Sequence, residues 1–337
     1  MNALARAPNL RSARVLVTGG AGFIGSHLAE ALQRSGARVR VLDDLSNGSR
    51  DNLPPGVEFI QADLADETAL AGALAGVDFV FHHAGLVNPV AAVEDPVRDF
   101  DTNARGTVLL LRQAIRAGVK RLLLASTNLY GDAPARERCR EDHPVLDAAG
   151  SLLSPYAAGK VAAEAYCQQF NDAGCLSTVR LRYSNVYGPR QTDRQGSGVI
   201  AIFTRAALEG SPLPVYGDGT QTRDFVHVND VVRANLLAVT SPTAGGRVFN
   251  VAAGVETTIG DLAQLVISLA GGGRVRLGPV RVADFRRGYI DIARISAQLG
   301  WRPLVGLSDG LRDYLAWLRG HLASRKTAAA APQFVNS

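Results

Sequence analysis

Cysteine, lysine and long apolar runs are scarce in this chain of 337 residues. The three cysteines, Cys139, Cys167 and Cys175, are an odd number without metal-type spacing, so we expect reduced, structural thiols and a cytoplasmic location. No apolar run reaches the roughly 20 residues that cross a bilayer, and Met1–Ser12 lacks the apolar stretch of a signal peptide. The six histidines show no ligand pattern. The sequence therefore predicts no membrane contact and no metal site.

Lysines and aromatic residues are also few. Only Lys120, Lys160 and Lys326 occur among 36 basic residues, and aromatic residues make up 6% of the chain. The basic residues are not clustered with aromatic ones, so the net charge of +5 does not indicate a nucleic-acid partner. With 47% hydrophobic residues, the chain can bury a sizeable core in one large domain or two coupled domains.

A glycine-rich turn near the N-terminus organises the rest of the chain. Val15–Val17 has the pattern of a short buried strand, and Ile24–Leu32 has the apolar spacing of a helix. Between them, glycine recurs at every third position, at Gly19, Gly22 and Gly25. Such a turn lets the backbone approach a pyrophosphate, whose charge is met by the free N–H groups of the helix N-terminus. The order of strand, glycines and helix predicts a dinucleotide site.

An acidic residue after the next strand indicates which dinucleotide binds. The predicted strand Arg38–Leu42 is followed by Asp43, near the spacing of about 20 residues at which a carboxylate meets the adenosine ribose hydroxyls. Because this carboxylate would repel a 2′-phosphate, the sequence predicts NAD rather than NADP as the cofactor.

Strands and helices alternate through the first half of the chain. Further strands are predicted at Val57–Ala62, Asp78–His82, Arg121–Ala125 and Thr178–Tyr183, and helices at Glu67–Ala75, Pro96–Ala117 and Tyr156–Asn171. This alternation predicts an α/β fold with a Rossmann-type doubly wound parallel sheet covered on both faces. Ligands of such sheets bind beyond the carboxyl ends of the strands. After Tyr183 the alternation breaks down, which indicates a smaller C-terminal α/β domain.

Tyr156 and Lys160 carry the predicted chemistry. They stand at positions i and i+4 of one predicted helix, so both side chains project from the same face. A free tyrosine has a pKa of about 10, and a nearby ammonium together with a positively charged nicotinamide would favour the phenolate. Ser126, at the end of a predicted strand, could hydrogen-bond the same substrate hydroxyl. This arrangement suits removal of a proton from a secondary alcohol while its hydride leaves for NAD⁺.

These residues, taken with other motifs along the chain, resemble the extended short-chain dehydrogenases/reductases. The motifs are Thr18–Gly25, Leu42–Leu45, His83–Gly85, Ser126 four residues before Tyr130, Ser154–Tyr156 with Lys160, Leu181–Arg190, Tyr216–Gly219, Arg223–Val228, Arg281 with Asp284, and Leu299–Trp301 with Pro303. Within that superfamily the chain is most similar to the NAD-dependent epimerase/dehydratase family and its nucleotide-sugar epimerases, typified by UDP-glucose (UDP-galactose) 4-epimerase. The resemblance covers about residues 14–303.

The resemblance implies two domains and a pattern of site residues. Residues 1–185 plus about 225–255 would form the NAD-binding Rossmann domain, about 186–224 plus 256–322 the nucleotide-sugar-binding domain, and 323–337 a disordered tail. The implied cofactor contacts are Gly19, Gly22, Phe23, Ile24, Gly25, Asp43, Asn47, Asp63, Leu64, His83, Ala84, Gly85, Asn103, Tyr156, Lys160 and Tyr183.

The resemblance also implies the residues that hold and convert the substrate. Tyr156 would be the general base. Lys160 would favour its phenolate form, and Ser126 would hydrogen-bond the substrate hydroxyl and share its proton. Asn185, Arg223 and Arg281 would bind the diphosphate, for which the planar guanidinium of arginine is well suited. The remaining substrate contacts would be Val199 and Tyr216, which flank the uracil, and Asp284, which binds the nucleotide's ribose hydroxyls.

Two polar residues distinguish between the reactions of this family. Dehydratases and decarboxylases place carboxylic side chains just after the strand-end Ser or Thr, whereas this chain has Thr127 and Asn128. Epimerisation at C4 needs only one base, one hydride acceptor and room for the 4-keto ring to turn over. We therefore predict an isomerase, an NAD-dependent UDP-hexose 4-epimerase.

Several alternatives remain open at this point. Gly288 would leave room for an N-acetyl group, which admits UDP-GlcNAc/UDP-GalNAc beside UDP-glucose/UDP-galactose. Arg286 and Arg287 would suit a C6 carboxylate, as in a UDP-glucuronate 4-epimerase or decarboxylase. Another nucleotide-sugar dehydratase or reductase, or a non-catalytic NAD-sensing protein, would also fit the fold. The resemblance further implies a homodimer, formed through Pro96–Ala117 and the helix from Tyr156.

Overall fold

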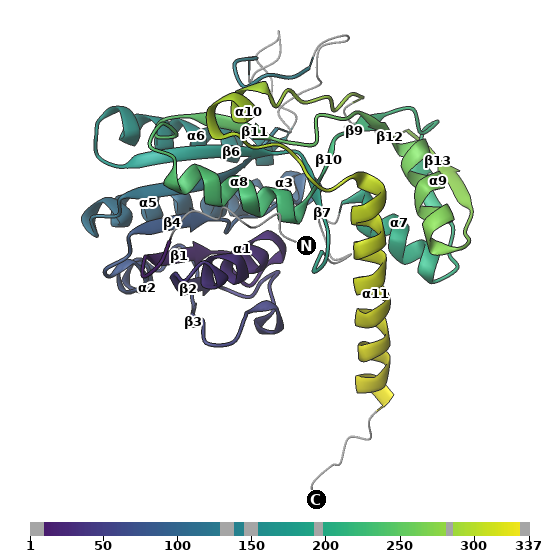
Figure 1. The fold of residues 1–337 in the computed structure, drawn as a ribbon, viewed down its shortest axis with the longest axis horizontal. Helices are drawn as coiled ribbons and strands as arrows, with labels where there is room; N and C mark the ends of the chain where they lie inside the picture. The colour runs from purple at the N-terminus through teal and green to yellow at the C-terminus, as the bar shows by residue number, and fades with distance from the viewer. Residues whose placement is uncertain (1–9, 129–137, 145–153, 192–197, 281–285, 331–337) are drawn as a thin grey trace, which may run out of the picture.

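The computed structural model describes residues 10–128, 138–144, 154–191, 198–280 and 286–330, with side chains described as far as residue 324. Its centre is a seven-stranded sheet in the order β11-β6-β5-β4-β1-β2-β3, with every neighbouring pair parallel (Figure 1). The strands are β1 (Arg14–Thr18), β2 (Arg38–Asp43), β3 (Glu58–Gln61), β4 (Phe79–His82), β5 (Arg121–Thr127), β6 (Ser177–Tyr183) and β11 (Val248–Val251). The predicted doubly wound parallel sheet is confirmed.

Helices cover both faces of this sheet because its strands are apolar on both sides. Alternate residues of β1 show this: Val15 and Val17 enter one core cluster, and Leu16 enters the other. The first cluster lies under α1 (Phe23–Arg34), α8 (Val228–Thr240) and α10 (Ala293–Leu299), and the second under α2 (Glu67–Leu74), α5 (Gly106–Arg116) and α6 (Pro155–Asp172).

The helical stretch before β5 differs from the prediction in one detail. The predicted helix Pro96–Ala117 consists of α4 (Pro96–Phe100), a π-helical turn η2 (Asp101–Arg105) and α5, which follow one another without a break. A short helix α3 (Pro89–Glu94) precedes them, and Asn88 and Asp95 cap α3 and α4. Single π-helical turns are frequent at functional sites, and this one carries Asn103.

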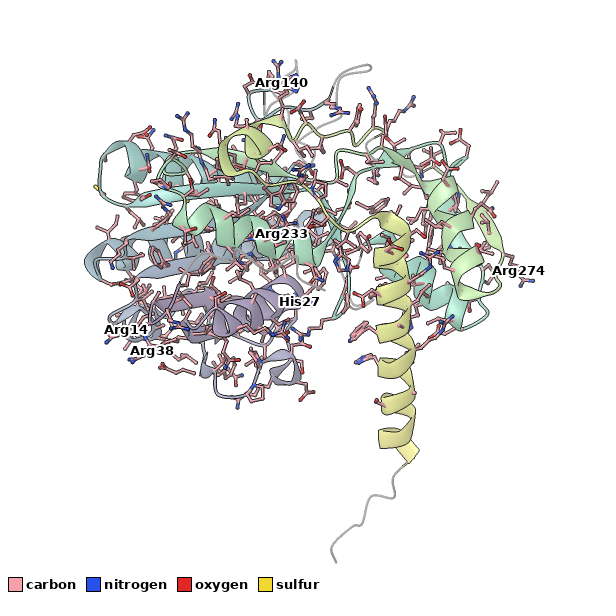
Figure 2. All side chains as sticks on the ribbon, in the orientation of Figure 1. Arg14, His27, Arg38, Arg140, Arg233 and Arg274 are labelled. Atoms are coloured by element: carbon pink, nitrogen blue, oxygen red, sulfur yellow. The ribbon has the colours of Figure 1, made fainter. Side chains whose placement is uncertain are left out.

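A second lobe with its own core lies beyond the carboxyl ends of the sheet strands. In Figure 2, Arg14 and Arg38, at the amino ends of β1 and β2, lie at the edge of the molecule far from this lobe. The lobe contains α7 (Val199–Leu208), α9 (Ile259–Ala270), and the strand pairs β7–β10 (Asn185–Tyr187, Phe225–His227), β9–β12 (Thr222–Arg223, Thr257–Thr258) and β8–β13 (Leu213–Tyr216, Val275–Gly278). A third core cluster fills it. A short 3-10 helix η1 (Arg50–Asn52) follows β2 in the sheet domain.

Two contacts join α1 of the sheet domain to the segment that follows β7. Arg190 donates to Ser26 and Glu30 of α1, at 3.3 and 2.7 Å, and His27 Nε2 lies 2.8 Å from the carbonyl oxygen of Pro189. The backbone at Arg190 is left-handed, with φ of 69°. The two lobes are thus joined by polar contacts directly beside the glycine turn.

Two features of the C-terminal part of the chain bear on the predicted division. Ile295 and Trp301, assigned by sequence to the second domain, pack in the first cluster on the sheet; Trp301 Nε1 donates to the carbonyl of Asp230. The tail expected from residue 323 continues instead as the helix α11 (Leu307–Ala330), because alanine has the highest helix propensity. Residues 331–337 lie outside the described residues, and the domain boundaries themselves stay predictions.

None of the helices described is long and apolar enough to cross a membrane.

Candidate active site

The turn between β1 and α1 is packed so tightly that only glycine fits. Gly19 has φ of 67°, and a Cβ on it would lie 2.5 Å from the backbone nitrogen of Ala84 at the end of β4. A Cβ on Gly25 would overlap the carbonyl of Gly19. Gly22 is the N-cap of α1 and provides no side-chain cap. The first N–H groups of α1, beginning at Phe23 and Ile24, lie at the β1/β4 switch point of the sheet, where the sequence predicts a pyrophosphate; that contact stays a prediction.

Asp43 lies against this turn. It is almost fully buried, and its two carboxylate oxygens accept the N–H groups of Ala21 and Leu45 at 2.9 and 2.8 Å. Burial raises the pKa of Asp43, while these backbone hydrogen bonds act in the opposite direction. The predicted ribose-binding carboxylate is thus held in place by the glycine turn itself.

The other predicted adenosine contacts also follow the carboxyl ends of strands. Asn47 lies exposed in the loop after β2. Asp63, after β3, is exposed and accepts the N–H of Ala65 at 2.7 Å. Leu64 is buried, where it packs against Gly106 at the start of α5. All three lie at one edge of the sheet, and their contact with adenosine stays a prediction.

The end of β4 brings small and polar residues beside the sheet. His83 Nε2 lies 3.1 Å from the hydroxyl of Tyr183, and the two rings stack at 6.0 Å. Burial lowers the pKa of His83 to about 4, so the ring is neutral at physiological pH. Ala84 N donates to Thr18 Oγ1 at 3.3 Å. These contacts fix the path of His83–Gly85 next to the glycine turn.

Asn103 presents an acceptor to this region. Its amide nitrogen donates to the carbonyl of Leu86 at 3.0 Å and to Asp99 Oδ1 at 2.8 Å. Its Oδ1 is buried and has no hydrogen-bond partner among the described atoms. A Cβ on Gly85 would lie 2.7 Å from this oxygen and 3.1 Å from Lys160 Nζ. A buried acceptor left open beside a bare glycine suits the amide or hydroxyl donors of a dinucleotide.

Tyr156 and Lys160 come together at the start of α6, as their spacing predicts. Ser154 caps this helix and Pro155 occupies its first position. Both side chains are 6% exposed, and Lys160 Nζ lies 6.0 Å from the centre of the Tyr156 ring. The ammonium also donates to the carbonyl of Ala125 at 3.3 Å. The pair is buried at the carboxyl end of β5.

Burial shifts both pKa values in the direction that favours the neutral form of each group. It raises the pKa of Tyr156 to about 12, against a hydrogen bond with Thr127 that lowers it. It lowers the pKa of Lys160 to about 8. The expected lowering for Tyr156 is therefore not present in the protein alone, because burial outweighs the hydrogen bond with Thr127 and the nearby carboxylate of Asp99 also raises the pKa. A further positive charge near the phenol, such as an oxidised nicotinamide, is needed to reverse it.

Two residues of this site were missed by sequence analysis. Thr127 shares a hydrogen bond with the phenol of Tyr156, and Asp99 is a buried carboxylate near Lys160. A signal for Asp99 was available: with Asn103 and Thr107 it forms a polar line at i, i+4 and i+8 of the predicted helix. Ser126 is likewise buried, at the end of β5.

Four of the predicted substrate residues lie on the second lobe. Val199 begins α7 and Tyr216 ends β8. Arg223, in β9, is largely buried and donates to the carbonyl of Thr222 at 2.7 Å. Asn185 donates to the carbonyl of Asp224 at 3.3 Å. Two more, Arg281 and Asp284, lie outside the described residues.

A polar cluster joins β9 to the segment after residue 285. Arg287 makes two hydrogen bonds to Glu256, at 2.8 and 3.1 Å, and Thr222 donates to the same carboxylate at 2.6 Å. The backbone N–H of Gly288 donates to Thr222 Oγ1 at 3.2 Å. The guanidinium of Arg287 is thus already paired with a carboxylate of its own chain.

Comparison with protein-family models matches residues 15–252 to the NAD dependent epimerase/dehydratase family. A UDP-glucose 4-epimerase of Mycolicibacterium smegmatis is 40% identical over 316 residues, which cover 91% of this chain and 98% of that protein. Relatives with other reactions match at lower identity. A dTDP-glucose 4,6-dehydratase of an Actinoplanes species is 32% identical, over 91% of this chain and 98% of its own length.

Solved structures of UDP-glucose 4-epimerases are also similar to this chain. The UDP-glucose 4-epimerase of Thermotoga maritima, with UDP-glucose, has a TM-score of 0.86 and 36% identity, covering 92% of this chain and 99% of that one. The UDP-glucose 4-epimerase of Thermus thermophilus, in complex with NAD, has a TM-score of 0.84 and 39% identity, covering 91% and 99%.

Proposed function

Because the chain belongs to the NAD dependent epimerase/dehydratase family, we propose that it inverts C4 of a UDP-hexose through a transient 4-keto sugar. The cofactor is NAD, as in the relatives solved with it. The residues present fit this cofactor: the glycine turn has no room for side chains, and Asn103 offers an open buried acceptor.

The observation that carries the proposal is the buried pair of Tyr156 and Lys160, together with the lack of a carboxylic side chain at the two positions after Ser126. At positions 127 and 128, Thr and Asn replace the carboxylic side chains that elimination or decarboxylation requires. Thr127 is instead hydrogen-bonded to Tyr156. One base and its tuning ammonium suffice for reversible oxidation at a single carbon.

In the proposed mechanism, Tyr156 removes the proton of the 4-hydroxyl and later returns it. Lys160 supplies positive charge that favours the phenolate, and Ser126 and Thr127 bind the hydroxyl groups involved. NAD, when bound, supplies the hydride acceptor and donor. Arg223 holds the diphosphate while the 4-keto ring turns over, together with Arg281 as the resemblance implies.

The contacts of Arg287 favour a neutral sugar over a uronic acid. A C6 carboxylate would have to compete with Glu256, which already accepts two hydrogen bonds from that guanidinium. We propose UDP-glucose/UDP-galactose as the substrate pair, with UDP-GlcNAc/UDP-GalNAc as the second, since Gly288 has no side chain to oppose an N-acetyl group.

Proton NMR of reactions with UDP-glucose, UDP-N-acetylglucosamine and UDP-glucuronate tests this function. The expected result is a mixture of two C4 epimers, reached from either epimer, with no net consumption of NAD. A pentose product or an accumulating keto sugar would instead identify a lyase. Tight NAD binding without turnover of any of the three would favour an NAD-sensing protein.

We also propose that two copies of the chain associate through α3 and α4. These helices expose four large apolar side chains to solvent: Val90, Val93, Val97 and Phe100. A cluster of this kind on consecutive helices is unusual for a surface that faces water only. The resemblance also implies a homodimer, formed through Pro96–Ala117, which contains α4, and the helix from Tyr156.

A further inference from the structure

In helix α4 two apolar side chains face solvent and an acidic one is buried, which is the reverse of the usual pattern. Val97 and Phe100 are 68% and 56% exposed, whereas Asp99 between them is 1% exposed. An aspartate is almost never fully buried unless it is paired. In this protein Asp99 faces the start of α6, next to Tyr156 and Lys160. We propose that Asp99 is a positioning residue, which orients Asn103 and Lys160 toward the nicotinamide side of the cofactor site.

The first support is the close packing of α4 on α6. Gly159 lies inside α6 between the two predicted catalytic residues, where glycine costs about 1 kcal/mol relative to alanine. A Cβ at this position would lie 2.9 Å from Asp99 Oδ2 and 3.1 Å from Asn103 Cβ. The missing side chain therefore lets the carboxylate reach the helix that carries Tyr156.

The second support is the orientation of the Asn103 amide. Its nitrogen has two partners, the carbonyl of Leu86 and the carboxylate of Asp99, and both accept hydrogen bonds only. The nitrogen must therefore face them, so Oδ1 is turned toward Gly85, where a Cβ would meet it at 2.7 Å. Burial raises the pKa of Asp99, while the Asn103 amide and the Lys160 ammonium act in the opposite direction. In its ionised form, Asp99 determines that the cofactor site receives an acceptor and not a donor.

The third support is electrostatic. The titratable groups that face Lys160 come from three elements: Asp99 of α4, Glu164 of α6, and His82 and His83 of β4. Both histidines are neutral, because burial lowers their pKa values to about 3 and about 4. Glu164 is already paired with Arg182 of β6 at 2.7 Å. Of the two carboxylates, Asp99 raises the pKa of Lys160 more, and it also raises that of Tyr156.

Asp99→Asn tests this role, since it keeps the shape and removes the charge. Removal of the carboxylate lowers the pKa values of both Tyr156 and Lys160, so both limbs of the pH profile of kcat/KM should move to lower pH by about one unit. Asp101→Asn is the matched control: it removes the same charge two residues away at an exposed position, and its profile should equal that of the unchanged protein.

This inference rests on the proposed function, so a second readout must not depend on turnover. The absorbance of tyrosinate, titrated in the NAD-loaded protein and in Tyr156→Phe, isolates the ionisation of Tyr156 from the other seven tyrosines. Asp99→Asn should shift that step to lower pH even if no sugar nucleotide is converted. Failure of the proposed function would leave this shift intact.

The proposal is overturned if Asp99→Asn lowers only thermal stability or activity at all pH values, while the Tyr156 ionisation stays where it is. In that case Asp99 would merely support the packing of α4 on α6. Should Asp99→Asn fail to fold, Asp99→Ser provides a smaller uncharged acceptor for Asn103, and the same shift of the Tyr156 step is expected.

Discussion

At the scale of single residues, Tyr156 combines deep burial with a phenol that loses its proton in the proposed mechanism. Tyr156→Phe removes only the hydroxyl, so we expect turnover to fall by a factor of about 10² to 10⁴, the usual contribution of a general base. Tyr166→Phe is the control, because Tyr166 lies on the same helix and is half exposed. Kinetic assays, together with circular dichroism and the bound NAD content, check this expectation. Full activity in a folded, NAD-loaded Tyr156→Phe protein would contradict it.

For Lys160, we expect stability and activity to change in opposite directions with pH. Its pKa is about 8 in the folded protein, below the ordinary value of 10.5, so the unfolded chain binds more protons between these two values. Stability that depends on Lys160 therefore rises with pH across this window and is lost as pH falls through about 8. Activity falls over the same window, because the ammonium loses its charge.

The comparison of Lys160→Met with the unchanged protein isolates this effect. The variant should gain stability relative to the unchanged protein at pH 7, by up to about 3 kcal/mol, and the gain should shrink toward pH 10. Urea unfolding at several pH values measures the difference. A difference that does not depend on pH would show that Lys160 titrates normally in the folded protein.

The sequence identified residues whose type and spacing define their chemistry. Gly19, Gly25 and Asp43 were predicted this way, and the structure packs Asp43, at the end of β2, against the glycine turn; their contact with the cofactor stays a prediction. Asp99 and Thr127 were missed. In the case of Asp99, an aspartate next to residues that are exposed has the sequence pattern of a surface residue. Only the packing of α4 on α6 shows that the carboxylate faces inward.

At the scale of elements, α6 contains a glycine whose replacement should destabilise the protein. Alanine normally stabilises a helix interior relative to glycine, but a Cβ at Gly159 would meet Asp99 Oδ2 at 2.9 Å. Gly159→Ala should therefore lower the free energy of unfolding by about 1–3 kcal/mol, the usual cost of overpacking. Gly72→Ala in α2 is the matched control: no atom lies within 4 Å of its Cβ, so a gain of up to about 1 kcal/mol is expected. Equal effects at both positions would contradict the close contact.

The elements of the sheet domain were largely predictable, because apolar periodicity and capping residues mark them. The π-helical turn η2 was not, since one widened turn hardly alters the apolar pattern of a long helix. The helical continuation of α11 past residue 322 was also missed. The expectation there is a disordered tail from residue 323, although the run of alanines favours the helix.

At the scale of the whole molecule, the exposed apolar residues of α3 and α4 predict self-association. Phe100→Asp places a charge in the proposed contact, so a dimer of the unchanged chain should become a monomer in sedimentation experiments. Leu277→Glu is the control, because Leu277 is at least as exposed as Phe100 but lies on β13 of the second lobe. A monomeric unchanged chain, or a dimer that tolerates Phe100→Asp, would exclude this interface.

The sheet and its doubly wound class were predicted correctly from strand and helix alternation. The second lobe was predicted only in outline. Its strands have two to four residues and pair across long stretches of chain, as β9 does with β12. Such pairings depend on distant partners and leave no local periodicity in the sequence.

The return of the chain to the sheet after the second lobe has a consequence for dissection of the protein. A fragment that ends after β6 would keep the glycine turn, Tyr156 and Lys160. It would lack α8, the edge strand β11 and the indole of Trp301, which together cover one face of the sheet. No single cleavage point therefore divides the described chain into two parts that each keep a complete hydrophobic core. Expression of either half alone should therefore give insoluble material, and proteolytic fragments should stay associated after cleavage.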